Sequence, residues 1–109
     1  MENFDVLIIG GGAAGLMAAV RAASLGRKTA IAEKNHSVGE KVLISGRGRC
    51  NFTNAEPDVD VFISKYGEKG KFLYSAFSRF SPADTMKFFN KIGVESVEER
   101  GKRIFPASG

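Results

Sequence analysis

The stretch Val6–Gly15, VLIIGGGAAG, decides the fold of this chain. It opens with an apolar, mostly β-branched run, which is typical of a buried parallel strand, and continues into consecutive glycines. The alanine-rich run Ala14–Leu25 and the glycine after it predict a helix with a C-terminal glycine. Lys28–Glu33 has the composition of a second short strand. Residues 1–33 are therefore predicted to form one βαβ unit with parallel strands and a right-handed crossover.

The glycines of this stretch follow the spacing G-x-G-x-x-G, between a predicted strand and a predicted helix. In such a motif Gly10 permits a tight turn, Gly12 lets a pyrophosphate approach the backbone, and Gly15 allows close packing of helix and strand. The N–H groups at the start of the helix would hold the phosphates. A P-loop is excluded because no Gly-Lys-Ser or Gly-Lys-Thr follows the glycines. The motif predicts a Rossmann-like dinucleotide-binding site.

Glu33 ends the second predicted strand, where a dinucleotide-binding unit carries an acidic residue for the ribose. Its carboxylate would accept hydrogen bonds from ribose hydroxyls and repel a 2′-phosphate, which favours FAD or NAD over NADP. The alternative is a glycine-rich turn in an unrelated α/β protein, with Glu33 an ordinary exposed acid. The strand, the alanine-rich helix and the acid occur in the expected order, and this context favours the dinucleotide.

The chain has 109 residues, enough for one domain or part of one, and its net charge of +4 is concentrated in one segment. Residues 34–54 contain Lys34, Lys41, Arg47 and Arg49, with Glu40 as the acidic residue. A local excess of this kind suits one anionic ligand better than a long polyanion. No nucleic-acid partner is therefore expected.

The apolar run from Val6 to Val20 is interrupted by glycines and preceded by Glu2 and Asp5. It fits neither a membrane span nor a signal peptide, so we expect a cytoplasmic protein without a membrane partner. Cys50 is the single cysteine, which excludes an internal disulfide, and no metal site is expected. We interpret it as a small packed thiol.

Periodicity is lost between Lys34 and Asp60, and this segment is predicted to be a long loop. It contains Ser45–Asn54, SGRGRCNFTN, in which two arginines flank a glycine. Such arginines can present forked donors to a phosphate or to the carbonyl edge of a flavin. An arbitrary sequence of this type would be a solvated basic loop, but its position soon after Glu33 favours ligand contact. We therefore interpret residues 34–60 as a cofactor loop.

Residues 61–109 are predicted to contain helices and a β-hairpin. Ser81 as an N-cap with proline after it indicates a helix over Pro82–Ile92. Val94–Glu99 and Arg103–Phe105 are typical of two strands joined by a turn. Aromatic residues at near-helical spacing before the helix are interpreted as core: Phe72, Tyr74, Phe77 and Phe80. Charged residues near them and in the hairpin are assigned to the surface: Lys69, Lys71, Glu98, Glu99 and Arg100.

Together these motifs resemble a family of bacterial flavoproteins, the aminoacetone oxidase and 3-dehydro-bile-acid reductase-like proteins. The resemblance runs along essentially the whole chain, and its most specific part is the sequence Gly-Arg-Cys-Asn-x-Thr-Asn. It is based on Val6–Gly15 with Glu33 and Lys34, on Gly39-x-Lys41, and on Ser45–Asn54, Phe88–Val94 and Arg103–Pro106. It implies an α/β, Rossmann-like FAD-binding domain of an oxidoreductase, with NAD(P)H as the expected electron source. Where a further glycine is common in the family, this chain has Arg47.

The resemblance also implies a set of cofactor-binding residues. Gly10, Gly12, Ala13, Ala14 and Gly15 would bind the pyrophosphate and Glu33 the ribose, while Lys34, Lys41, Gly48, Arg49, Cys50 and Asn51 would lie along the flavin. No Cys-x-x-x-x-Cys is present, so the redox-active disulfide of the pyridine-nucleotide disulfide reductases is absent. Family members are several times longer, and we expect residues 1–109 to be the N-terminal segment of an FAD/NAD(P)-binding Rossmann-like domain, which is incomplete because the rest of the polypeptide is missing.

Two alternatives stay open. One is a module that binds a dinucleotide without turnover. The other is a truncated fragment with no activity of its own, because two parallel strands and a hairpin bury little surface. No residue is identified as catalytic, the lone His36 is assigned no role, and the sequence does not predict the small-molecule substrate.

Overall fold

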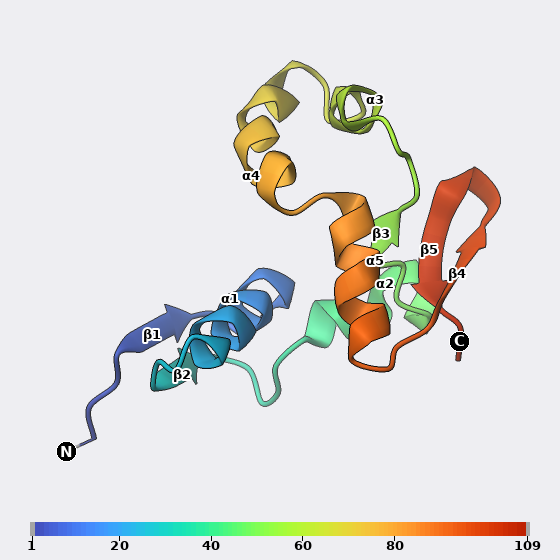
Figure 1. The fold of residues 1–109 in the computed structure, drawn as a ribbon. Coiled ribbons are helices and arrows are strands. Elements are labelled where there is room, and N and C mark those ends of the chain that lie inside the picture. Colours follow the sequence, from blue (N-terminus) through green and yellow to red (C-terminus); the bar gives the residue numbers. More distant parts are fainter. Residues whose placement is uncertain (1, 109) are drawn as a thin grey trace. The chain divides into compact units, whose positions relative to one another are not determined.

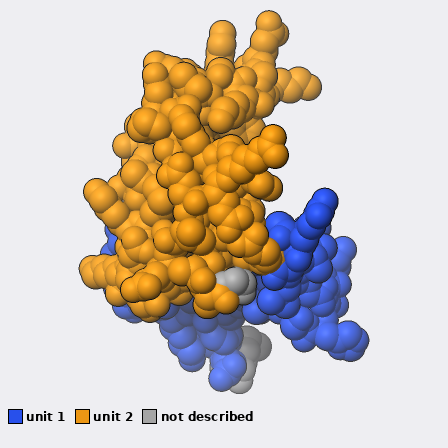
Figure 2. All heavy atoms as spheres, turned by 90° about the vertical axis from the view of Figure 1, so that its right-hand side faces the viewer, with its two compact units in different colours: residues 1–48 blue, residues 49–109 orange. Residues whose placement is uncertain are grey.

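The computed structural model describes residues 2–108. The chain divides into two compact units, residues 1–48 and residues 49–109, which are coloured separately in Figure 2. The helices and strands of both units are labelled in Figure 1. None of the helices among residues 2–108 is long and apolar enough to cross a membrane. The two units are described in turn.

The first unit opens with the predicted βαβ arrangement (Figure 1). Strand β1 spans Val6–Ile9, helix α1 spans Ala13–Ser24 and strand β2 spans Thr29–Ala32. The strands are parallel, with Val6 opposite Thr29 and Ile9 opposite Ala32. After α1 the chain turns at Gly26, whose φ of 78° is left-handed and so favours glycine. The sequence prediction of an α/β, Rossmann-like unit is confirmed.

Strand β1 is less buried than its apolar composition predicts. Its side chains alternate between half-buried and exposed, and Leu7 and Ile9 are 62% and 78% exposed. Successive side chains of a strand point to opposite faces of the sheet. This sheet has two strands, and α1 packs against both of them. The prediction of a fully buried strand is therefore wrong for one face of β1.

The segment predicted to be a loop, residues 34–60, contains regular structure. Helix α2 spans Glu40–Gly48, strand β3 spans Thr53–Asn54, and helix α3, Val59–Ser64, begins at the end of the segment. Helix α2 is interrupted near its end, where Gly46 and Arg47 have left-handed φ values of 57° and 58°. These elements are too short to show a hydrophobic period, which is why the sequence did not reveal them.

The second unit contains an antiparallel sheet with the strand order β3, β5, β4. Strand β4 spans Ser96–Glu99 and strand β5 spans Arg103–Pro106, with Glu99 opposite Arg103 and Val97 opposite Phe105. The chain passes between them through a short 3₁₀ turn, Arg100–Lys102. The predicted hairpin is confirmed, and β3 adds a third strand to it.

Helices precede this hairpin. Helix α4 spans Tyr74–Arg79 and follows a 3₁₀ segment over Glu68–Leu73, and helix α5 spans Pro82–Lys91. The start of α5 is a capping box, in which the Ser81 side chain accepts from the Asp84 N–H and the Asp84 carboxylate accepts from the Ser81 N–H. The predicted N-cap of this helix is confirmed.

The core of the second unit is small. Among the described residues its buried apolar side chains are Ile63, Ile104 and Phe105, each 2% exposed. The predicted aromatic core is wrong for Phe72, Tyr74 and Phe80, which are exposed, whereas Phe77 packs on Phe62 with ring centroids 5.0 Å apart. The helical spacing misleads here, since α4 begins after Phe72, which lies in the preceding 3₁₀ segment.

Candidate functional site

The N-terminus of helix α1 is open to a ligand. Gly12 is the N-cap with extended backbone (φ −77°, ψ −170°), and among residues 2–108 no side chain caps this helix end. The first turn of α1 also contains no acidic residue. The first N–H groups of a helix have no partner within the helix and carry its positive partial charge. This helix end is therefore suited to an anion such as a pyrophosphate.

The three motif glycines are required for different reasons. Gly10 has a φ of 100°, which a side chain would strain. At Gly12 a Cβ atom would meet nothing within 4 Å, so the space beside its backbone is free for a ligand. At Gly15 a Cβ atom would overlap the carbonyl oxygen of Gly10 and lie 3.3 Å from the Ile8 side chain. Gly15 thus serves the packing of α1 on β1, whereas Gly12 leaves room for close approach.

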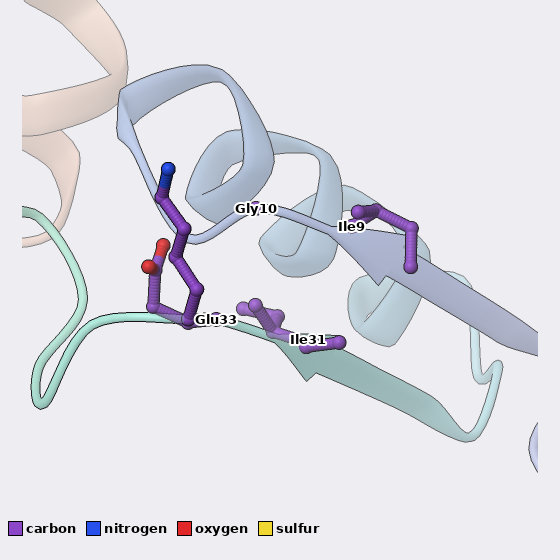
Figure 3. A pocket seen from close by; sticks show the side chains of 6 residues that line it. Ile9, Gly10, Ile31 and Glu33 are labelled. Atoms are coloured by element: carbon purple, nitrogen blue, oxygen red, sulfur yellow. The ribbon is translucent and has the colours of Figure 1, made fainter.

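Glu33 follows β2 and its side chain turns toward the loop after β1, as Figure 3 shows. Its carboxylate accepts hydrogen bonds from the Asn35 N–H and the Gly11 N–H, both at 2.8 Å. These two backbone donors, Asn35 first, hold the pKa of Glu33 below its ordinary value. The carboxylate is therefore ionised at neutral pH, and it lies beside the glycine turn.

A hollow of about 770 Å³ lies at the carboxyl ends of β1 and β2 (Figure 3). Its lining consists of Ile9, Gly10, Ile31, Ala32, Glu33 and Lys34. Ligands of open parallel sheets bind at this end of the strands, and the volume is within the range of small-molecule sites. A second hollow, lined by Asn54, Phe62, Lys65 and Tyr66, has about 210 Å³ and is too small for a dinucleotide.

The first unit brings most of the predicted cofactor residues together. The glycine turn, the start of α1, Glu33 and Lys34 surround the end of the two-stranded sheet. Gly39 ties the following segment to them, because its N–H donates to the Gly11 carbonyl oxygen at 2.7 Å. Lys41 and Gly48 lie on α2, and both are exposed.

The other three predicted cofactor residues, Arg49, Cys50 and Asn51, lie in the second unit. The Arg49 guanidinium donates through both terminal nitrogens to the carboxylate of Glu99 and lies 4.4 Å from the Phe105 ring centroid. The Asn51 amide donates to the carbonyl oxygens of Thr53 and Ile104, both at 3.0 Å. Cys50, between them, is half-buried and has a left-handed φ of 63°.

Glu99 is the residue that the sequence did not reveal. The sequence predicts a surface charge at this position, but the Glu99 carboxylate is half-buried against Arg49. The hydrogen bond from Arg49 is the main reason why the pKa of Glu99 is lowered. The two residues are 50 positions apart, and the linear sequence carries no signal that connects them.

Residues 4–109 match the model of the HI0933-like protein Rossmann domain. The chain belongs to the HI0933-like Rossmann domain family. The family resemblance and the Rossmann fold predicted from the sequence are thereby confirmed. Rossmann units in general bind a dinucleotide with a glycine turn, the start of the following helix and an acidic residue after the second strand.

Named relatives of this HI0933-like chain include a synthase, a reductase and a dehydrogenase. The chain is 36% identical over 105 residues to the ribosomal RNA dihydrouridine synthase of Escherichia coli, a match that covers 96% of this chain and 26% of the relative. It is 36% identical over 103 residues to the 3-dehydro-bile acid delta(4,6)-reductase of Clostridium scindens, with 93% and 24% covered. A shorter match, 55% identical over 38 residues, is to the dihydrolipoyl dehydrogenase of Rhizobium etli, with 35% and 8% covered.

The HI0933-like chain spans about a quarter of the length of the two longer-matching curated relatives. These similarities support a dinucleotide-binding portion that is related to parts of flavoprotein oxidoreductases.

Proposed function

We propose that this chain is the FAD-binding portion of a flavin-dependent oxidoreductase that takes its electrons from NAD(P)H. The proposal rests on one observation: the ionised carboxylate of Glu33 lies next to the N-terminus of α1, which has no side-chain cap. Glu33 accepts the Gly11 N–H at 2.8 Å, one residue before the Gly12 N-cap of α1. This pair provides a positive end for a pyrophosphate and an acceptor for ribose hydroxyls.

In this proposal each predicted residue has a role. The pyrophosphate lies against Gly10, Gly12, Ala13, Ala14 and Gly15, and the ribose hydroxyls bind Glu33. Lys34 and Lys41, with Gly48, Arg49, Cys50 and Asn51, serve the flavin side of the site. The open space at Gly12 fits a ligand in close contact with the backbone, which is the structural support for this arrangement. When bound, a flavin supplies two-electron hydride chemistry, and the protein binds and orients it.

The names of two relatives narrow the class of substrate that we propose. One relative is named for making dihydrouridine in ribosomal RNA, and the other for reducing a 3-dehydro-bile acid at delta(4,6). Dihydrouridine is uridine with its ring double bond saturated next to a carbonyl, and a 3-dehydro, delta(4,6) steroid has double bonds conjugated with a ketone. We therefore propose a carbon–carbon double bond conjugated with a carbonyl as the substrate class, with two hydrogens added across it.

The flavin spectrum tests the proposed function. The protein encoded by the whole reading frame that contains these residues is expected to be yellow when purified and to release FAD on denaturation. Anaerobic NADH or NADPH is expected to bleach the flavin absorbance, and an enone is expected to restore it. A protein that retains its flavin but resists both nicotinamides is a binding module without NAD(P)H turnover. A colourless protein that binds only NAD would refute the assignment.

Glu33→Ala is expected to weaken FAD binding by about 1–3 kcal/mol, the cost of a lost hydrogen bond to a charged group. Because backbone donors, Asn35 first, lower the pKa of Glu33 in the folded apoprotein, its carboxylate stays ionised down to that lowered value, and its contribution to FAD binding is lost only as the pH falls through it. FAD affinity should thus be flat from about pH 6 to pH 8 and decline in acid. Equilibrium titration of the apoprotein, followed by flavin fluorescence, measures both effects.

Glu40→Ala is the matched control, since Glu40 is an exposed carboxylate of the same segment with one long contact, 3.4 Å from the Ser37 hydroxyl. Its FAD affinity should equal that of the unaltered protein. Equal losses in the two variants would show a general charge effect and remove Glu33 from the ribose site.

A further inference from the structure

The residues that follow Gly48 are held on the hairpin of the second unit. The Phe52 N–H and the Asn51 side-chain amide both donate to the carbonyl oxygen of Ile104, at 3.1 and 3.0 Å. Thr53 then pairs with Ile104 as β3 joins the edge of β5. Ile104 is 2% exposed, so these hydrogen bonds reach into the interior of the unit.

Arg49 anchors the same segment from the other side of Cys50. The two terminal nitrogens of its guanidinium donate to the two carboxylate oxygens of Glu99, and the plane of the guanidinium lies on the Phe105 ring. Strand alternation places Glu99, Arg103 and Phe105 on one face of the β4–β5 hairpin, because Glu99 is opposite Arg103 and Val97 is opposite Phe105. Two of the five N–H donors of Arg49 and one face of its guanidinium are thus already engaged within the second unit.

We propose that Arg49 and Asn51 serve the cofactor as positioning residues, and that Glu99 is a third positioning residue for the same site. This inference rests on the proposed function. Cys50 lies between the two anchors with a φ of 63°, a conformation that residues other than glycine rarely adopt. Anchors on both sides hold this backbone in place before a ligand arrives, and a segment that is ordered beforehand loses less entropy on binding.

The contribution of the Arg49–Glu99 pair to stability is expected to be small. The Arg49 and Glu99 side chains are 44% and 33% exposed, and ion pairs near the surface stabilise folded proteins little. Loss of the pair should therefore be visible in cofactor binding rather than in folding. A change in cofactor affinity without a change in the free energy of unfolding would therefore report the positioning role of the pair.

A double-mutant cycle in the full-length protein tests the proposal. Arg49→Met, Glu99→Ala and the double variant are prepared as apoproteins and titrated with FAD. Each single variant is expected to raise the dissociation constant about tenfold, and the double variant also by about tenfold, because both substitutions remove the same contact. The bound flavin of all three should show the same altered visible circular dichroism. Glu99→Gln, which keeps the shape of the side chain, should show a smaller rise and safeguards against misfolding of the alanine variant.

Independent effects would overturn the proposal. If the double variant raises the dissociation constant about a hundredfold, Arg49 touches the cofactor itself and Glu99 acts separately. Unchanged affinity in both single variants would likewise remove the pair from the site. A flavin-free unaltered protein would instead refute the proposed function, which separates the two failures.

Glu56→Gln provides the matched control. Glu56 accepts from the Lys102 ammonium at 3.1 Å, so this ion pair also ties the segment after β3 to the hairpin, but it lies beyond the anchors around Cys50. The control is expected to leave the dissociation constant unchanged within about twofold. An equal rise in the Glu56 variant would mean that any loosening of the hairpin weakens binding, and would contradict a specific role for Arg49 and Glu99.

Discussion

Replacing Gly12 with valine is expected to remove the flavin from the full-length protein and to leave its fold intact. A Cβ atom at Gly12 meets nothing within 4 Å, and the φ of −77° is one that valine adopts. The new methyl groups would instead occupy the space proposed for the pyrophosphate. We expect the affinity for FAD to fall at least about a hundredfold, or roughly 3 kcal/mol. Flavin content at purification and the unfolding midpoint of the apoprotein measure the two effects.

Gly12→Ser sharpens this test because serine is a good N-cap residue, whereas valine is a poor one. A serine hydroxyl can accept a hydrogen bond from an N–H of the first turn of α1, which otherwise has no side-chain cap. The serine variant should therefore be at least as stable as the unaltered apoprotein and still bind FAD more weakly. Retained flavin in the valine variant would show that Gly12 does not face the dinucleotide.

Unlike the Gly12 substitutions, Gly15→Ala is expected to destabilise the fold. Its Cβ atom would overlap the Gly10 carbonyl oxygen and lie 3.1 Å from the Gly10 carbonyl carbon. Both are backbone atoms, so relief requires α1 to move away from β1. We expect a loss of stability on the order of 3 kcal/mol, at the upper end of overpacking effects. Chemical denaturation of the apoprotein measures this loss, and flavin binding should fall with it.

Ala18→Val is the matched control for Gly15→Ala, because Ala18 is an exposed position of the same helix. It should cost no more than about 0.7 kcal/mol, the range of intrinsic helix propensity. A Gly15→Ala variant as stable as this control would mean that α1 and β1 do not pack as closely as the structure shows. Loss of binding without loss of stability in Gly12→Ser, and loss of both in Gly15→Ala, would separate the two glycine roles.

The parts of the fold that the sequence predicts are those with local causes. The β1–α1–β2 unit follows from an apolar run, a glycine turn and an alanine-rich helix, and α5 follows from its capping box. Strand β3 has no such cause, because two residues become a strand only by pairing with β5. The site divides in the same way. The sequence singles out Glu33 because it directly follows a predicted strand. The contact of Glu99 with Arg49 forms only in the folded chain, so the sequence does not single out Glu99.

The sequence also overstates burial. An apolar run predicts a buried strand, but burial depends on what covers each face, and Leu7 and Ile9 point to a face that nothing among residues 2–108 covers closely. Likewise the spacing of Phe72 from Phe77 assumes one continuous helix, whereas the structure changes from 3₁₀ to α-helix between them. Hydrophobic periodicity predicts a local helix or strand, but it does not predict which other elements will cover its apolar side chains.

The peptide groups of Gly11 have a consequence for any substitution of Glu33. The Gly11 N–H is held by the Glu33 carboxylate, and its carbonyl oxygen is held by the Gly39 N–H that begins the approach to α2. Exchanging Glu33 for a residue without a side-chain acceptor would leave the Gly11 N–H without this partner. A redesigned turn therefore has to supply a replacement acceptor for the Gly11 N–H.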